Sequence, residues 1–413
     1  MSLEHLETLR HDMKKCVRCS LCKLVPLPTI QQTRFTSACP PVDEYHFHAY
    51  SGGGMNVMAL ALLDGRIGVD RDLAQIVSAC TTCGLCDVSC KFIMAAERQD
   101  VIIALKEYIA ELGFGTAPQL ENPSPLPNWA DGLRLKTLPE SQAEVLLFVG
   151  AGVHHNLQHA ATARKLAKLL RRARVDFGIL EDEPESGIEA YWIGQRQGFA
   201  EQAQRVVDRL DNARAKTIAT LCGEDLGMLR SKYPSYYRAP QAKVLHVSEF
   251  LLPLIQKGRL RLTQPVKQCV TYHDPCYLGR QSEPPLVWQG EERQTHGVMR
   301  YFTPPKPINY GVNGVFDAPR KVLRTIPGLR LVEMHRIREY AYCCGGGGGV
   351  PDAHPNVARS AALQRVDEAR AVGAETLVTA CQHCRHNLTH WQDGTITPVV
   401  DVVDLVYTAA GLG

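Results

Sequence analysis

The 413-residue sequence lacks long hydrophobic runs. Its first residues, MSLEHLETLRHDMKK, are charged and contain no apolar run of the kind found in a signal peptide. No later segment approaches the ~20 consecutive apolar residues of a membrane-spanning helix. We therefore expect a cytoplasmic protein that reaches the inner face of a membrane only through a partner.

The sequence also has little net charge and no nucleotide signature. Its 46 Lys and Arg balance 43 Asp and Glu, and they form no basic stripe, so we expect no nucleic-acid partner. The glycine run at 345–349 is not followed by GKS or GKT and does not fit the dinucleotide fingerprint. Without a flavin or nicotinamide signature, any redox reaction would depend on partner subunits.

Cysteine, by contrast, is abundant: the chain has 15. In a reducing compartment, closely spaced cysteines are better explained by metal ligation or redox catalysis than by disulfides. Thirteen of them form an N-terminal and a C-terminal group, and the other two, Cys222 and Cys269, are expected to be small buried hydrophobic residues.

The patterning of the chain predicts four segments. Residues 1–115 are expected to form a small helical domain, since RDLAQIVSA and AAERQDVIIALKEYIAELGFG have amphipathic spacing. Residues 116–142, with five prolines between Pro118 and Pro139, predict a linker. From there, short β-rich runs alternate with amphipathic helices, in a first lobe at 143–265 and a second at 266–413. The predicted class is α+β multidomain: an all-helical domain and two related α/β lobes with mainly parallel sheets.

The two lobes look like an internal duplication. AKTIATLCGED (215–225) aligns without a gap with AETLVTACQHC (374–384), so that Cys222 matches Cys381 and Asp225 matches Cys384. A less secure extension places Glu185 and Ser186 opposite Cys343 and Cys344, and Ala151 near Cys276. The first lobe would then be a degenerate copy that keeps one cysteine of five. The alternative is a chance likeness between two strand–helix units.

The second lobe contains an apparent insertion at 281–312. This stretch is rich in proline, glycine and aromatic residues and has no periodicity, so we predict a loop. It is equally compatible with a lid or docking surface beside a site and with a solvated insertion.

The N-terminal cysteines are spaced for two 4Fe-4S cubane clusters. CVRCSLC and CTTCGLCDVSC each wrap three cysteines around a cluster, and the fourth ligand arrives from the other motif, as in two-cluster ferredoxins. The predicted ligand sets are Cys16, Cys19, Cys22 and Cys90 for one cubane, and Cys39, Cys80, Cys83 and Cys86 for the other. Lys91 replaces the proline usual after the last cysteine, and 16 residues separate Cys22 from Cys39, which fits a helical ferredoxin. Structural zinc is the competing interpretation, but zinc favours paired CxxC motifs.

Five C-terminal cysteines form a different pattern, with HDPC, CCGGGGG and CQHC each following a predicted strand. Such strand ends converge on one crevice of an α/β sheet. The adjacent Cys343 and Cys344 face the same side only if the backbone turns sharply, which glycine permits. Gly345 and Gly346 also allow backbone N–H groups to approach anionic sulfurs.

HDPCYLGR, DAPRKVLRTIPG, CCGGGGG and TACQHC, behind a twin-cluster helical domain, resemble the heterodisulfide reductase catalytic subunits (HdrD-like), with a ferredoxin domain fused to cysteine-rich CCG domains. The resemblance implies that one complete CCG motif holds a non-cubane 4Fe-4S cluster that cleaves a disulfide. Its implied ligands are Cys276, Cys343, Cys344, Cys381 and Cys384. The archetypes have two complete motifs and this chain has one, which leaves a two-cluster mechanism in doubt.

The expected function is an iron–sulfur oxidoreductase subunit that passes electrons through two cubanes to the non-cubane cluster, where a small disulfide is reduced or a thiol oxidised. The alternative is an electron-transfer subunit that links a flavoprotein dehydrogenase, of the glycerol-3-phosphate or glycolate oxidase type, to quinone or a membrane complex. Expected partners are a flavoprotein or HdrA-like subunit, or a membrane quinone-reactive subunit.

Four side chains are candidates for donating protons to a leaving thiolate. They flank the predicted cluster ligands and are His273, Asp274, Tyr277 and His383. For His273 and Asp274 the alternative is a structural hydrogen bond at the strand end.

Overall fold

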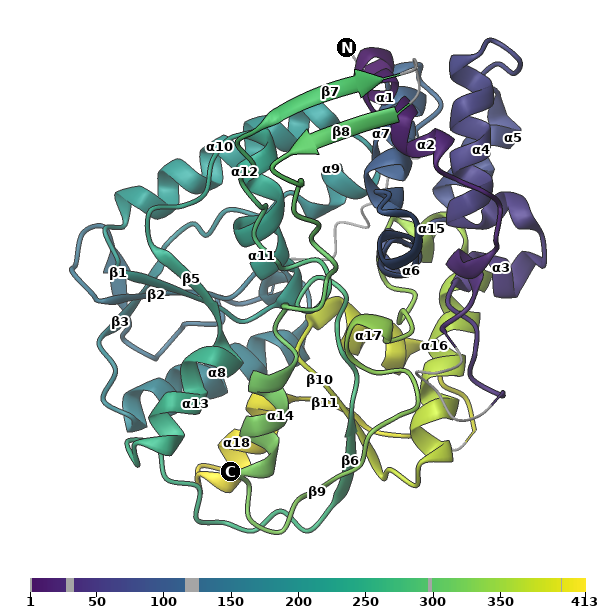
Figure 1. Ribbon diagram of the computed structural model, residues 1–413. Coiled ribbons are helices and arrows are strands. Elements are labelled where there is room, and N and C mark those ends of the chain that lie inside the picture. The colour runs from purple at the N-terminus through teal and green to yellow at the C-terminus, as the bar shows by residue number, and fades with distance from the viewer. Residues whose placement is uncertain (1, 27–32, 116–125, 296–298, 395) are drawn as a thin grey trace.

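The computed structural model describes residues 2–26, 33–115, 126–295, 299–394 and 396–413. A group of N-terminal helices lies beside two α/β lobes, which are coloured teal and green to yellow in Figure 1. The predicted fold class, α+β with an all-helical N-terminal domain and mainly parallel sheets, is confirmed.

The N-terminal part is built from helices packed around α7. Polar caps start two of them: the Ser51 side chain accepts a hydrogen bond from Gly54 N in α4, and Asp70 accepts one from Leu73 N in α5. Leu6, Ala59 and Leu105 lie in the core of this part. The helices are α1 (Ser2–Thr8), α2 (Arg10–Lys14), α3 (Pro40–Tyr45), α4 (Gly52–Leu63), α5 (Arg71–Ser78), α6 (Leu85–Met94) and α7 (Arg98–Glu111).

Lobe 1 contains a parallel five-stranded sheet in the order β1-β3-β2-β4-β5. Its strands are β1 (Lys136–Leu138), β2 (Val145–Phe148), β3 (Phe177–Leu180), β4 (Thr217–Thr220) and β5 (Lys243–His246). Strand β1 comes from the proline-rich stretch in which we predicted no strand. The helices are α8 (Leu157–Arg172), α9 (Ile188–Trp192), α10 (Arg196–Asn212), α11 (Gly223–Gly227), α12 (Tyr233–Tyr236) and α13 (Val247–Gln256).

Lobe 2 repeats this topology. Its parallel sheet has the order β9-β6-β10-β11, with β6 (Cys269–Tyr272), β9 (Arg330–Leu331), β10 (Thr376–Thr379) and β11 (Val399–Asp401) in the places of β2, β3, β4 and β5. In both lobes the last strand leads directly into a helix with a capping box. This repeat agrees with the predicted duplication. The helices are α14 (Asp317–Arg324), α15 (Val350–Ala353), α16 (Pro355–Ala371), α17 (Gln382–His390) and α18 (Val402–Ala409).

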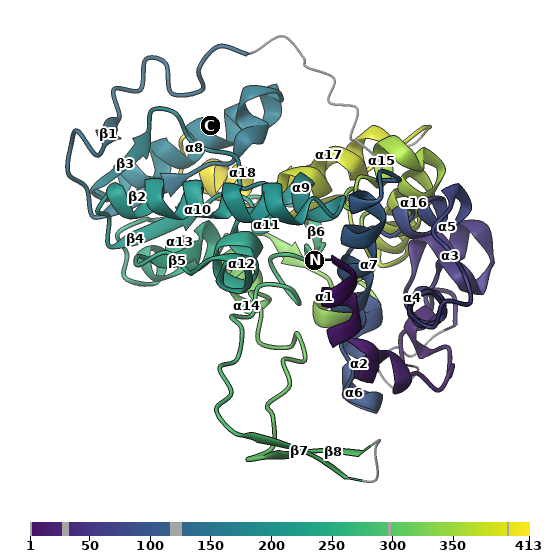
Figure 2. The ribbon, with the colours of Figure 1, turned by 90° about the horizontal axis from the view of Figure 1, so that it is seen from above.

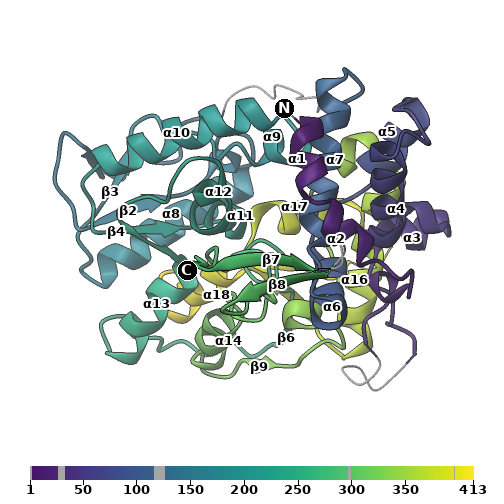
Figure 3. The same ribbon diagram turned by 45° about the horizontal axis from the view of Figure 1, so that its top comes forward.

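The two lobes share one hydrophobic core. Helix α8 packs against α18, and α13 packs against α14, so that each contact joins one lobe to the other. Leu166 of α8 and Val406 of α18 are completely buried in this core. The N-terminal helices then lie along both lobes, with α7 beside α9 and α3 beside α16 (Figure 3). All three parts therefore meet near the ends of β6 and β10.

The 281–312 insertion forms a hairpin where we predicted an irregular loop. Strands β7 (Glu291–Thr295) and β8 (Met299–Thr303) pair only with each other and project from the body as an arm (Figure 2). The sequence EERQT is polar throughout, so it lacks the alternation of apolar and polar residues by which a strand is recognised in a sequence.

Within the described ranges, no helix combines the length and the apolar character needed to cross a bilayer.

Candidate metal centres

The first N-terminal cysteine set surrounds one cavity. Cys16, Cys19, Cys22 and Cys90 all line it, so the structure brings together the four residues that we assigned to one cubane. Two N–H donors point at its sulfurs: Gly53 N lies 3.3 Å from Cys22 Sγ, and Arg98 Nε lies 3.1 Å from Cys90 Sγ. Cys19 is the exposed member of the set.

The second set lies deeper. Cys39 precedes α3, Cys80 and Cys83 lie in the loop before α6, and Cys86 lies in the first turn of α6. Each interacts electrostatically with others of the set. Gly52 makes room for them, because a Cβ there would lie 2.9 Å from Cys86 Sγ. Burial raises the pKa of the Cys39 and Cys86 thiols well above the usual value. Such thiols become thiolates when a cation compensates their charge, which fits a metal cluster.

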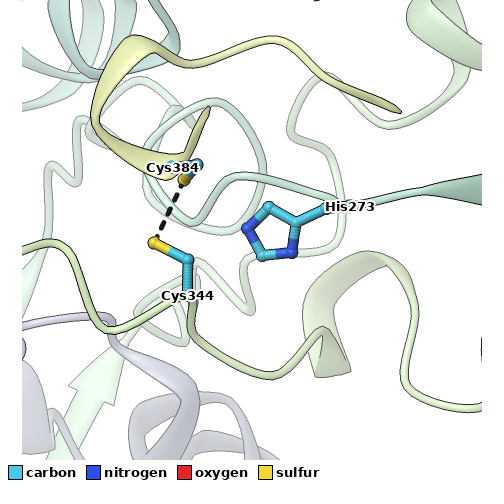
Figure 4. A group of neighbouring side chains, drawn as sticks. All are labelled: His273, Cys344 and Cys384. Carbon is cyan, nitrogen blue, oxygen red and sulfur yellow. Dashed lines mark hydrogen bonds between the residues drawn. The ribbon is translucent and has the colours of Figure 1, made fainter. Parts of the chain in front are cut away.

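The C-terminal cysteines gather near the ends of β6 and β10. Cys276 and Cys381 follow these strands, as we expected, whereas Cys343 and Cys344 follow a 3-10 turn (Arg338–Tyr340) and not a strand. Cys344 Sγ lies 3.3 Å from Cys384 Sγ, and His273, Cys344 and Cys384 place their ligand atoms within 4.8 Å of one another (Figure 4). Cys381 contacts Cys384, and Cys344 contacts Cys343. Cys276 packs beside Cys343, so all five cysteines lie at one site.

The thiols form a continuous row that reaches the N-terminal part. Cys343 packs beside Cys83 of the second N-terminal set, and at the other end Cys381 lies beside Cys222 of lobe 1. The row therefore runs Cys83, Cys343, Cys344, Cys384, Cys381, Cys222. All fifteen cysteines fall within the described residues and are free thiols.

The glycine run has two roles, one of which we predicted. Gly345 has φ +89°, and its N–H lies 3.3 Å from Cys343 Sγ, while Gly346 N lies 3.4 Å from Cys344 Sγ. The second role is close approach of the backbone: a Cβ on Gly347 would lie 3.0 Å from Thr81 O, and one on Gly348 would lie 2.3 Å from Cys80 O. The run thus packs directly on the N-terminal cysteine loop.

Two of the four candidate proton donors are held by cations. His273 is 1 % exposed, and its Nδ1 accepts a hydrogen bond from Arg365 Nε at 3.0 Å. Burial, with Arg365 beside it, holds the pKa of His273 well below its usual value, so the ring is neutral. Both carboxylate oxygens of Asp274 pair with Arg320, at 2.5 and 2.8 Å.

The other two candidates differ in exposure. The Tyr277 hydroxyl is buried, accepts a hydrogen bond from Trp192 Nε1 at 2.9 Å and contacts Thr82 of the N-terminal cysteine loop. His383 contacts the Glu224 carboxylate through Nδ1, and 41 % of its side chain is exposed. Burial opposes protonation of His383, but Glu224 outweighs it and raises the pKa well above its usual value.

The structure adds residues that the sequence analysis did not single out. Arg280, which ends the HDPCYLGR motif, donates from Nε to Cys83 O at 2.7 Å and interacts electrostatically with Cys83, Cys276 and Cys343. Lys106 Nζ donates to Cys80 O at 3.0 Å. Both are buried cations beside thiols that would be negatively charged as ligands. The motif could have pointed to Arg280, whereas Lys106 sits in an amphipathic helix with no distinguishing pattern.

Comparison with known proteins supports iron–sulfur chemistry at both ends of the chain. Residues 12–92 match the 4Fe-4S dicluster domain family, and residues 301–389 match the cysteine-rich domain family CCG. The second match includes Cys343, Cys344, Cys381 and Cys384.

Curated relatives extend the likeness over most of the chain. The D subunit of the dihydromethanophenazine:CoB–CoM heterodisulfide reductase of Methanosarcina mazei is 31 % identical over 81 % of this chain and 78 % of its own length. The protein of the same name from Methanosarcina barkeri is 28 % identical over 97 % of this chain and 95 % of its own length. A probable membrane-anchored ferredoxin of Chromohalobacter salexigens is 32 % identical over 81 % of this chain, which spans about half (48 %) of that longer protein.

The dicluster match, the CCG match and the cysteine sites agree with one another. The protein holds 4Fe-4S clusters and acts in electron transfer. The chain belongs to the HdrD family of iron–sulfur oxidoreductases, named for the D subunits of heterodisulfide reductases.

Proposed function

We propose that this chain passes electrons through two 4Fe-4S cubanes to a non-cubane 4Fe-4S cluster, at which a small disulfide is reduced or the corresponding thiols are oxidised. In the reducing direction the balance is R–S–S–R′ + 2 e⁻ + 2 H⁺ → RSH + R′SH. The proposed ligands are the three cysteine sets described above. The cubanes supply one-electron relay and the non-cubane cluster supplies a binding position for a substrate sulfur.

The contact between Cys83 and Cys343 carries this proposal. One is a proposed ligand of the second cubane and the other a proposed ligand of the terminal cluster, and the two buried side chains pack in one cluster and interact with each other. Arg280 holds this junction, because it binds Cys83 O at 2.7 Å and Ala341 O at 2.8 Å. Ligands in contact give a short route for electrons between the two sites.

Among the four proton-donor candidates, His383 is the one that combines contact with solvent and a place between two proposed ligands. Its ring packs edge-on against Trp192 and contacts Glu224. We assign to His383 the delivery of a proton to the leaving thiolate. Asp274 and Tyr277 hold the loop after β6 in place through their contacts with Arg320 and Thr82. The hydrogen bond from Arg365 fixes the orientation of the His273 ring.

Electrons must come from, or go to, a partner subunit. Curated relatives include a heterodisulfide reductase component and an EtfAB:quinone oxidoreductase of Syntrophomonas wolfei. We propose a flavoprotein or a membrane quinone-reactive subunit as the partner, which would also place the chain at a membrane surface. The exposed Cys19 marks the first N-terminal set as the entry point.

The test uses the full chain, purified anaerobically with its clusters. With a low-potential dye as reductant, we expect turnover of small disulfides, and we expect oxidised protein to give a thiol-dependent electron paramagnetic resonance signal. Cys343→Ser should abolish that signal and turnover while it spares the cubane signals. Cys269→Ser, at a buried cysteine outside the three sets, is the matched control. Quinone reduction without turnover of any disulfide would reject the proposal in favour of simple electron relay.

A further inference from the structure

Cys222 is the sole cysteine of the sequence between residues 143 and 265, and it lies at the interface between the lobes. It follows β4 and forms the N-cap of α11, with 3 % of its surface exposed. On the other side of the interface, Cys381 follows β10 and forms the N-cap of α17. The two cysteines thus occupy equivalent places in the repeated topology, and they face each other.

The backbone holds these two strand ends together. Gly223 N donates to Ala380 O of lobe 2 at 3.2 Å. A Cβ on Gly223 would lie 2.7 Å from Leu278 Cβ, so a larger residue would separate the lobes here. The position of the Cys222 thiol is therefore fixed by the lobe interface.

The thiol of Cys222 belongs to a group of potential ligands. Its Sγ, Cys381 Sγ and a Glu224 carboxylate oxygen all lie within 4.8 Å of one another, and all three residues are buried. Cys222 Sγ also lies 3.7 Å from the Glu224 carboxylate, to which it donates a weak hydrogen bond. Cys381 is in turn part of the five-cysteine site, so Cys222 extends that site by one sulfur.

The other positions of the first copy form a separate, polar group. Asp225, which matches Cys384, interacts with Ser186, which the less secure extension of the alignment places opposite Cys344. The nearby Glu183 accepts hydrogen bonds from Val149 N and Gly150 N. These polar residues find their partners within lobe 1, whereas the Cys222 thiol lies beside a sulfur of lobe 2.

We propose that Cys222 supplies a thiolate ligand from lobe 1 to the terminal iron–sulfur cluster. The inference rests on the proposed function, in that the five cysteines of lobe 2 hold such a cluster. Thiolate is the preferred ligand of iron–sulfur clusters, and a sixth sulfur at this place would let one cluster join the two lobes.

The experiment compares anaerobically purified wild-type protein with Cys222→Ala, Cys222→Ser and the control Cys269→Ala. Iron and sulfide analysis of the wild type, with about 12 iron atoms per chain for three 4Fe-4S clusters, first tests the proposed function. For Cys222→Ala we expect either a shifted terminal-cluster signal in electron paramagnetic resonance or its loss with a fall to about 8 iron atoms. The cubane signals, which report on folding, should persist, and Cys269→Ala should match the wild type.

The outcomes separate the two claims. A wild-type chain without a terminal cluster overturns the proposed function and the inference together. A wild-type chain with the cluster, and Cys222→Ala with unchanged signal and iron content, overturns only the role of Cys222. If Cys222→Ala fails to fold, Cys222→Ser decides, since an oxygen ligand shifts the signal and a non-ligand leaves it unchanged.

Discussion

At the residue scale, a buried charge beside the cysteines is compensated by an ion pair. Asp274 and Arg320 are 2 % and 4 % exposed and form a two-pronged ion pair next to the Cys276 loop. Arg320 also pairs with Glu333 at 2.9 Å. A buried pair of this kind need not add stability, but the loss of one partner leaves the other charge without compensation.

Arg320→Met tests this dependence. It leaves the buried Asp274 carboxylate without its ion-pair partner and with the backbone N–H of Arg338 as a hydrogen-bond donor, and we expect a loss of about 3–5 kcal/mol in the free energy of unfolding. The measurement is anaerobic denaturant unfolding. The matched control is Arg359→Met, which breaks the exposed pair with Asp393 and should cost less than about 1 kcal/mol. Equal losses in the two variants would contradict the expectation.

A second residue-scale prediction concerns pH. Burial, together with Asp404, raises the pKa of Asp401 to about 7, and Asp401 Oδ1 caps α18 by accepting from Val403 N at 2.8 Å. The folded state therefore binds more protons than the unfolded state below about pH 7, and stability falls as the pH rises through this window. Asp401→Asn keeps the cap and removes the titration.

Relative to Asp401→Asn, the wild type should lose about 2 kcal/mol of stability between about pH 5 and pH 7. Thermal unfolding of both proteins across this range measures the difference. Parallel pH profiles would show that Asp401 stays ionised in the folded state.

At the scale of elements, the glycine run of lobe 2 is the place where its backbone packs directly on the N-terminal cysteine loop at Cys80 and Thr81. Gly348 has φ +75° and its Cα side faces Cys80 O, so a methyl group would meet a carbonyl at 2.3 Å. A longer distance between Gly348 and Cys80 O would also move Cys343 away from Cys83. The close approach of the glycine run therefore sets the spacing of the two proposed clusters.

Gly348→Ala should therefore slow electron transfer between the proposed cubanes and the proposed terminal cluster, and it should destabilise the protein by more than backbone strain alone. Gly373→Ala is the control, because Gly373 has a similar φ of +73° but no atom within 4 Å of a Cβ. For Gly373→Ala we expect a loss of about 1 kcal/mol in the free energy of unfolding. Only Gly348→Ala should slow the re-reduction of the proposed terminal cluster, and by several-fold. Freeze-quench electron paramagnetic resonance gives the rate, and similar behaviour of both variants would refute this role of the glycine run.

For the molecule as a whole, the Lys106 side chain binds all three parts at once. Its Nζ donates to Cys80 O of the N-terminal part, to Trp192 O of lobe 1 at 3.1 Å and to Gly348 O of lobe 2 at 3.3 Å. A single buried ammonium group thus satisfies carbonyls from three segments that are far apart in sequence.

Lys106→Met has nearly the same length but cannot donate hydrogen bonds. It leaves three carbonyls without this donor, and we expect a loss of about 3 kcal/mol or more, since each unsatisfied group costs about 1–3 kcal/mol. Hydrogen exchange should become faster at residues 80–83 and 347–349, where the parts meet. Lys136→Met, at an exposed ion pair with Asp176, should leave exchange there unchanged.

The hydrophobic pattern of the sequence predicted the buried inner strands but not every edge strand. The inner strands β2, β3 and β10 are buried along their full length and appear in the sequence as apolar runs. Two strands of lobe 1 were not predicted, β1 and β5; both lie at the edges of its sheet and are partly exposed. An edge strand buries fewer side chains, so its sequence carries a weaker signal.

The sequence by itself determined the local features of this protein: the CxxCxxC spacing, the turn-permitting glycines and the repeated strand–helix units, because each depends on neighbouring residues. The tertiary structure alone decided the contacts between distant segments, such as Cys83 with Cys343, Cys222 with Cys381, and Lys106 with its three carbonyls. These contacts depend on how the lobes and the N-terminal helices pack, which is a property of complementary surfaces and of no single stretch of chain.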